Sequence, residues 1–425
     1  MVDPHSPDAT PGDKPVGFWR RLAAGAKDLS PVSIFKVALG FWIAFALIVA
    51  IVVAVKPSSH TATLEYQKAS ANWWKGKDIY RNKNGYLYLP QEAILYTPYE
   101  LLPDRVGEPL WRVTILALLG WSLWQTAGVL ASARREQTFL LASLIALPSC
   151  LSSAQNGQVN MPLAALYLLT AVALARKRWN LTALILIVAL ALKPISIVPI
   201  LLVGALYAKT RLPLLVGFVL LYASAFLHPS PAYVQGQYEL FVTTLLKAGK
   251  PTGNTWCDYA GIFRTTCDAL PQGVNDFLTP YAPIIAKVNT LIRAVAALLT
   301  FGLCWWVTRS RDAVRAAFTV LLLAVIYLML FNPRTEANSY VMMGAFTGLW
   351  AGYELTVGRR PRIALWLIAF ALVLGVECYG WPIFPYTDHW AKALATIALA
   401  LWLALKIATT PKGEPVIMLP ARDEP

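Results

Sequence analysis

Long apolar segments separated by short polar connections run through most of this chain. A helix that crosses a bilayer needs roughly 20 mostly apolar residues, and the pattern predicts about twelve such helices. The expected spans cover residues 33–55, 109–131, 137–153, 159–175, 181–192, 195–207, 212–227, 288–307, 313–331, 339–355, 363–378 and 391–407. The fifth and sixth are short and are interrupted by Pro194 and Pro199, so one broken re-entrant hairpin is the alternative for this pair. The expected fold class is an all-α polytopic membrane protein.

Two of the connections are long and rich in aromatic and polar residues. The first covers residues 56–108 and the second covers residues 228–283. Within the first, residues 63–74 have the spacing of a short amphipathic helix lying in the membrane interface, and a second interfacial piece is expected over residues 93–102. For the tryptophans of this loop, a plain aromatic belt at the membrane surface is the alternative explanation.

Composition and charge agree with this class and give it an orientation. Hydrophobic residues make up 57% of the 425 residues and charged residues 14%, which is too apolar for a soluble protein of this size. Every second connection is basic, and the positive-inside rule then places those connections and both termini in the cytoplasm. The basic clusters are Arg20/Arg21/Lys27, Arg134/Arg135, Arg176/Lys177/Arg178, Lys209/Arg211, Arg309/Arg311/Arg315, Arg359/Arg360/Arg362 and Lys406/Lys412. Because the net charge of +14 is spread over these turns, nucleic acid is not an expected partner.

The two ends of the chain differ from its apolar body. The first 30 residues are rich in Pro, Asp and Gly and are expected to form a disordered cytoplasmic tail. Residues 31–410 are expected to form a single transmembrane domain, and residues 411–425 a second cytoplasmic tail. The two long loops would then lie on the opposite, outer side of the membrane.

Two of the five cysteines differ in setting from the others. Cys150, Cys304 and Cys378 fall in or beside apolar spans and are expected to be packing residues. Cys257 and Cys267 both lie in the second long loop. Outside the cytoplasm, a disulfide between these two would close a short loop.

The first long loop carries most of the candidate general bases. Its carboxylates include Glu65, Asp78 and Glu92, although a single carboxylate at an outer surface usually only faces water. Glu92 is distinctive because it lies between Pro90 and a run of apolar residues, where desolvation would raise its pKa. A carboxylate with a pKa near neutrality suits general-base catalysis.

Polar residues at the outer ends of the spans form a second group of candidates. Residues 155–160 read Gln-Asn-Gly-Gln-Val-Asn, and their amides either bind a ligand or simply cap a helical hairpin turn. Lys193 is an isolated cation deep in an apolar run, a costly placement that indicates a functional or paired group. Arg334 and Glu336 lie between two later spans and either pair with each other or serve a site. Together, Lys193 and Arg334 would supply two cations suited to an anionic phosphate.

At these motifs the chain resembles glycosyltransferase family 87. The resemblance is carried, in order along residues 66–340, by YxxA…WWxGxDIY, YLYLP…LYTPYELLP, QNGQVN, ALKPISIVPILLV, GNTW…R and NPRTEANSY. This family consists of multi-spanning enzymes of the GT-C type and includes mannosyltransferases that depend on polyprenol-phosphate-mannose. The resemblance implies a GT-C-like domain in the bacterial inner membrane that transfers a hexose such as mannose from a polyprenyl-phosphate carrier to a lipid or cell-envelope glycan.

The resemblance also implies roles for individual residues. Lys193 and Arg334 match the phosphate-binding role in an inverting reaction that uses neither a metal nor a cofactor. The residues that match segments expected to contact the sugar, headgroup or acceptor are Gln155, Asn156, Gln158, Asn160, Tyr66, Tyr88, Asn254 and Asn338. Membrane lipids are expected as further partners.

One position departs from the family pattern and leaves the general base open. The family's base is an Asp about four residues before the tyrosine that matches Tyr66, and this chain has Ala62 there. The base is then Glu65 or another carboxylate, namely Asp78, Glu92 or Glu336. Two other functions stay open: a transporter or flippase for a lipid-linked sugar or phosphate, and an inactive scaffold.

Overall fold

The computed structural model describes residues 30–56, 61–81, 86–248, 256–262, 282–380, 383–387 and 389–419, and within these ranges every regular element is a helix. The α-helices are α2 (Pro31–Val55), α3 (Thr63–Trp74), α4 (Pro90–Glu100), α5 (Asp104–Leu130), α6 (Arg135–Asn156), α7 (Asn160–Ala175), α8 (Trp179–Leu192), α9 (Ile197–Leu206), α10 (Arg211–Ser224), α11 (Pro231–Ala248), α14 (Ala282–Val307), α15 (Ala313–Phe331), α16 (Val341–Tyr353), α17 (Pro361–Leu374), α18 (Phe384–Thr387) and α19 (Ala391–Thr409). The all-helical prediction is confirmed for this part of the chain.

Fewer described helices are long enough to cross a membrane than the sequence pattern predicts. By length and apolarity, seven helices of the described chain can cross a membrane. Four further apolar helices are shorter, namely α7, α8, α17 and the segment Pro194–Leu206 that contains α9. With 14 residues, α8 is about 21 Å long at 1.5 Å per residue, whereas the hydrocarbon core is about 30 Å thick. The prediction of about twelve spans counted these short helices as full crossings.

Helix ends follow local sequence signals. The first span begins with Ser30, whose hydroxyl accepts a hydrogen bond from the Ser33 backbone N–H at 3.2 Å, and Pro31 occupies the first helical position. Asp312 caps α15 in the same way and accepts from the N–H of Arg315 at 2.9 Å. At the end of α6, Gly157 has φ +64°, a left-handed conformation that glycine adopts without steric cost.

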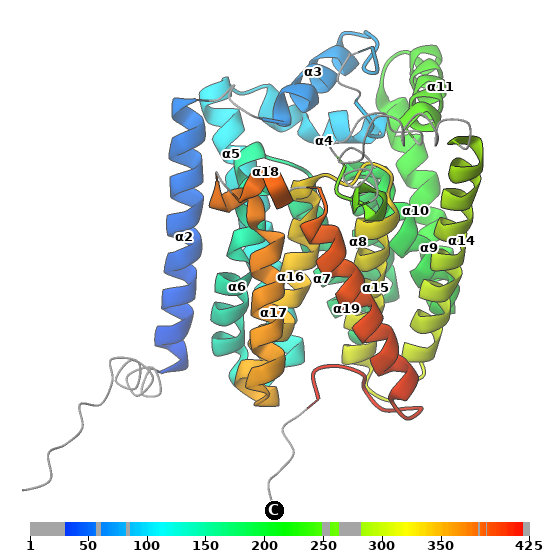
Figure 1. Cartoon of the computed structure of the whole chain (residues 1–425). Coiled ribbons are helices and arrows are strands. Elements are labelled where there is room, and N and C mark those ends of the chain that lie inside the picture. Colours follow the sequence, from blue (N-terminus) through cyan, green and yellow to red (C-terminus); the bar gives the residue numbers. More distant parts are fainter. Residues whose placement is uncertain are drawn as a thin grey trace, which may run out of the picture.

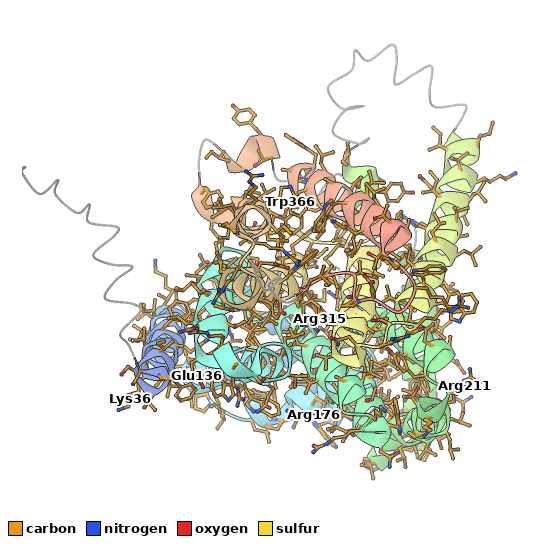
Figure 2. The ribbon with its side chains drawn as sticks, turned by 90° about the horizontal axis from the view of Figure 1, so that it is seen from below. Lys36, Glu136, Arg176, Arg211, Arg315 and Trp366 are labelled. Carbon is orange, nitrogen blue, oxygen red and sulfur yellow. The ribbon has the colours of Figure 1, made fainter. Side chains whose placement is uncertain are left out.

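The two ends of the helix bundle differ in character (Figure 1). The end that carries α3, α4 and α11, at the top of Figure 1, is here called the upper end. The start of α2 and the end of α19 both lie at the opposite, lower end (Figure 1). Figure 2, a view from that lower side, shows Lys36, Arg176, Arg211 and Arg315. The elements from the two long connections therefore gather at one end, and basic residues lie at the other.

A close contact between α6 and α16 organises the centre of the bundle. Gly344, Gly348 and Gly352 recur every fourth residue along α16 and face α6. A Cβ atom at Gly348 would lie 2.9 Å from the Ala142 carbonyl oxygen, and one at Gly352 would lie 2.9 Å from that of Thr138. Small residues at this spacing let two helical backbones approach closely. A polar connection follows α6 and another precedes α16, both at the upper end. The contact between the two helices therefore fixes the spacing of these connections.

The chain after α19 folds back onto the lower end of the bundle. Residues 416–418 are buried, and the Arg311 backbone N–H donates to the Gly413 carbonyl at 3.0 Å. Arg315 Nε donates to the Met418 carbonyl at 2.5 Å. The sequence predicts a tail from residue 411 onward, and within the described part of that tail residues 416–418 pack against the helices.

Candidate active site

A cavity of about 460 Å³ lies where α8, α11 and α15 end. Its walls come from four parts of the chain that are distant in sequence, and a short helical turn, η2 (Pro194–Ser196), begins beside it. The lining residues that carry polar or aromatic groups are Tyr88, Lys193, Trp256, Tyr327, Phe331, Asn332, Arg334 and Glu336. The cavity brings together four residues that the sequence analysis singled out separately, namely Lys193, Arg334, Glu336 and Tyr88.

Lys193 reaches this cavity because α8 ends there. The residue before a proline is pushed away from helical geometry, and Lys193, which precedes Pro194, is extended with φ −155° and ψ 129°. Its Nζ atom donates a hydrogen bond to Asn160 Oδ1 at 2.8 Å. Burial lowers the pKa of this ammonium group, while the nearby Glu336 carboxylate opposes the shift. No carboxylate of the described chain forms an ion pair with it.

Arg334 is the second cation of the cavity. Its Nε donates to the Ala248 carbonyl at 3.1 Å, and its guanidinium lies 5.5 Å from the centroid of the Trp256 ring. Neither Glu336 nor any other carboxylate in the described ranges lies within ion-pair distance of it, so the predicted alternative of an Arg334–Glu336 pair is not observed. The guanidinium is thus held in place without having its charge neutralised.

Amide side chains connect Lys193 to Glu336. Asn160 Nδ2 lies 2.8 Å from Gln158 Oε1 and 3.0 Å from Asn338 Oδ1. Gln158 Nε2 then donates to Glu336 Oε2 at 2.8 Å. Gln158 lies in the turn after α6 and Asn160 begins α7, while Glu336 and Asn338 belong to the connection before α16. The close α6–α16 contact therefore holds both halves of this network together.

The four candidate bases occupy different environments. Glu336 lines the cavity, whereas Glu65 lies on α3 and pairs with Lys68 at 3.2 Å. Asp78 accepts a local hydrogen bond from the Tyr80 backbone N–H at 2.7 Å. Of these four carboxylates, Glu336 is the one that lies beside the two cations.

Glu92 is buried behind the cavity wall. One of its oxygens accepts a hydrogen bond from the Tyr86 hydroxyl at 2.6 Å, and the other has no hydrogen-bond partner in the described chain. Burial raises its pKa from 4.5 to about 8, as the apolar sequence context predicts. At neutral pH this group is mostly the uncharged acid.

The tyrosines of the first long connection form a packed cluster beside Glu92. The Tyr66 and Tyr88 hydroxyls lie 3.2 Å apart and their rings meet edge to face at 5.3 Å. Tyr88 lines the cavity, while Tyr66 is buried behind it, with its hydroxyl 3.5 Å from the Val159 backbone N–H. Burial raises the pKa of both phenols, so both stay neutral.

The remaining candidates lie away from the cavity or outside the described residues. Gln155 and Asn156 do not line it: the Gln155 carbonyl accepts from Arg112 Nε at 3.1 Å, and the Asn156 carbonyl accepts from the Ala62 N–H at 3.0 Å. Asn254 and Cys267 lie outside the described residues, as does the predicted Cys257–Cys267 disulfide. Cys257 itself is buried, and its N–H donates to the Thr335 carbonyl at 2.7 Å.

Sequence reasoning missed two features of this region. Trp256, whose ring lies near Arg334, was part of the GNTW…R motif but was not singled out as a site residue. Glu108 and Arg112 form an ion pair that is only 1% exposed on each side, and Arg112 also donates to Thr61 Oγ1 at 2.8 Å. Their spacing of four residues at the start of an apolar helix could have indicated the pair. In the described ranges, no three His, Cys, Asp or Glu residues cluster as metal ligands.

The described chain thus combines apolar helices long enough to cross a membrane with a cavity that is lined by two cations and a carboxylate. Residues 86–333, more than half of the chain, match the family model of glycosyltransferase family 87. The chain belongs to this family and is therefore a membrane glycosyltransferase. No curated protein matches the chain.

Proposed function

We propose that this glycosyltransferase moves a hexose from a polyprenyl-phosphate carrier to a hydroxyl of a lipid or cell-envelope glycan. The observation that supports this most is the pair of cations in the cavity, Lys193 and Arg334, neither of which is neutralised by a described carboxylate. A phosphate diester linked to a sugar carries a negative charge that such a pair would bind. The nearby Glu336 supplies a group that can accept a proton.

The proposed reaction is a single displacement with inversion at the sugar C1. The acceptor oxygen forms a bond to C1 while the bond between C1 and the phosphate oxygen breaks, and the electron pair of that bond stays on the phosphate. Lys193 and Arg334 stabilise the charge that grows on the departing phosphate. Glu336 takes the proton of the acceptor hydroxyl. This balance of atoms and charges requires no metal and no cofactor.

The neutral groups of the site have a proposed role in holding the sugar. Gln158, Asn160 and Asn338 do not line the cavity, but their amides belong to the hydrogen-bond network of Lys193 and Glu336 and would help to hold sugar hydroxyl groups beside it. Tyr88 and Trp256 offer aromatic faces at the cavity wall. Asn254, which lies outside the described residues, stays a predicted contact. Gln155 and Asn156, by contrast, support the turn through their backbone carbonyls.

The proposed orientation places the upper end at the outer face of a bacterial cytoplasmic membrane. The basic residues at the lower end support this, because cytoplasmic connections are enriched in Lys and Arg. Both termini would then be cytoplasmic, with a GT-C-like arrangement in which the donor enters from the bilayer and the acceptor from the outer side.

A transfer assay tests the proposal directly. Purified protein in lipid nanodiscs would receive a panel of radiolabelled polyprenyl-phosphate sugars and a total lipid extract of the host, with Arg334→Ala as the inactive control. Label that moves into a new lipid or glycan with the wild type alone would support the proposal and name the donor. Folded wild-type protein that transfers no label from any donor would contradict it.

A further inference from the structure

A buried ion pair lies directly behind the connection that carries Arg334 and Glu336. Lys392, the second residue of α19, is fully buried and pairs with Glu377 in the short helical turn η8 (Val376–Tyr379). Its Nζ atom also donates a hydrogen bond to the Ala337 carbonyl at 3.0 Å. A buried ammonium is costly unless it is paired and hydrogen-bonded, so these contacts together allow Lys392 to stay inside the bundle.

Ala337 stands between two residues of the site. Glu336 precedes it and receives a hydrogen bond from Gln158, and Asn338 follows it and receives one from Asn160. The hydrogen bond from Lys392 to the Ala337 carbonyl therefore restrains the backbone that carries the Glu336 and Asn338 side chains.

The same lysine also contacts the end of this connection. Its Nζ lies 5.6 Å from the centroid of the Tyr340 ring, and the Tyr340 hydroxyl donates to the Cys257 carbonyl at 2.7 Å. Lys392 and Glu377 both lie beyond residues 86–333, which the family model matches, so membership of the family does not assign them a role.

We propose that Lys392 is a positioning residue that sets the place of Glu336 and Asn338 by holding the Ala337 carbonyl, while Glu377 balances its charge. The inference rests on the proposed function. A general base must lie within hydrogen-bond reach of its proton, and a displacement of about 1 Å can cost about 10²-fold in rate. The lysine itself touches neither the cavity nor the proposed substrate.

Two variants separate positioning from stability. Lys392→Met keeps the length of the side chain but removes the Ala337 contact, whereas Glu377→Gln keeps Lys392 and that contact. We expect Lys392→Met to lower kcat at least about tenfold with little change in the KM for the donor. Glu377→Gln should lower the melting temperature while kcat of the folded protein stays within about twofold of wild type. Wild-type kcat in Lys392→Met, or parallel losses of kcat in both variants, would overturn the proposal.

Hydrogen–deuterium exchange gives a readout that does not depend on turnover. Peptides covering residues 332–340 should exchange faster in Lys392→Met and at the wild-type rate in Glu377→Gln, and unchanged exchange in Lys392→Met would overturn the proposal. Wild-type protein that transfers no sugar would refute the proposed function, and the exchange result would still decide the role of Lys392. If Lys392→Met does not fold, the double variant Lys392→Met/Glu377→Leu replaces it, because exchanging both members of a buried pair for apolar residues is often neutral for stability.

Discussion

Replacing Lys193 by methionine removes one cation from the cavity while keeping most of the side-chain volume. Lys193 forms no ion pair with a described carboxylate, so the change leaves no buried counter-ion behind. Two unit charges 4 Å apart interact by about 4 kcal/mol at an effective dielectric constant of about 20, and a hydrogen bond to a charged group contributes about 1.5–3 kcal/mol net. We therefore expect a loss of about 2–3 kcal/mol in transition-state stabilisation, or on the order of 10²-fold in kcat/KM.

The assay is the initial rate of sugar transfer in nanodiscs, with the melting temperature measured on the same preparation. Burial disfavours the charged lysine, but the change also leaves the buried Asn160 Oδ1 without its donor, so Lys193→Met should melt close to the wild-type temperature. Lys68→Met is the matched control, since the Lys68 side chain is 55% exposed and pairs with Glu65 away from the cavity. A kcat/KM for Lys193→Met within about threefold of wild type, less than about 1 kcal/mol, would refute the phosphate role.

Three further substitutions test the proposed base, the buried acid and the α6–α16 contact. Glu336→Gln should lower kcat by about 10²–10⁴-fold with donor KM little changed, and a normal kcat would exclude it as the base. Because burial raises the pKa of Glu92 from 4.5 to about 8, its neutral form stabilises the fold fully below about pH 4.5, and this stabilisation is lost as the pH rises toward 8. Glu92→Gln should therefore flatten the decline of melting temperature between pH 5 and pH 8, a decline that corresponds to at most about 5 kcal/mol in the free energy of unfolding. An unchanged decline would contradict the buried acid. Gly348→Ala should destabilise the protein by about 1–3 kcal/mol, because the new Cβ would meet the Ala142 carbonyl oxygen at 2.9 Å. Its control is Gly236→Ala, where nothing lies within 4 Å, and equal melting temperatures for the two variants would argue against the tight contact.

The sequence predicts the helical class well because apolar periodicity and length are local properties. The number of crossings depends on something less local, since α8 is about 21 Å long and a neighbouring helix or a local thinning of the bilayer must make up the difference. The prediction began the first span at residue 33 and missed the cap at Ser30. The hairpin turn at residues 155–160 was one of its stated alternatives, and Gly157 has the left-handed geometry that suits such a turn.

The cations of the site could be selected from sequence because an isolated charge in an apolar run has a large energetic cost. Lys193 met this criterion, and Lys392 meets it too, at the start of the last apolar segment, but it was overlooked. The carboxylates were not ranked correctly, because Glu92 was singled out whereas Glu336 is the one that lines the cavity. Whether Glu65, Glu92 or Glu336 faces the cavity depends on the register of each element against its neighbours, which one sequence does not reveal.

The family comparison covers part of the proposed machinery. Its matched residues, 86–333, include Lys193 and Tyr88 but end just before Arg334 and Glu336. The resemblance read from the motifs extended over residues 66–340, and the parts at either edge rest on this chain's own geometry. Variants of Arg334 and Glu336 therefore test roles at positions that the family match does not cover.

The glycine contact between α6 and α16 contributes no lining residue to the cavity, but it supports the amide network that holds Glu336. Three glycines bring the two helix backbones into direct contact, so α6 and α16 can neither separate nor slide without losing that contact. Other parts of the cavity lining come from the short turn at Pro194, the end of α11 and Trp256. We therefore expect any change in cavity width that admits a donor headgroup to come from these segments, while the position of Glu336 stays fixed.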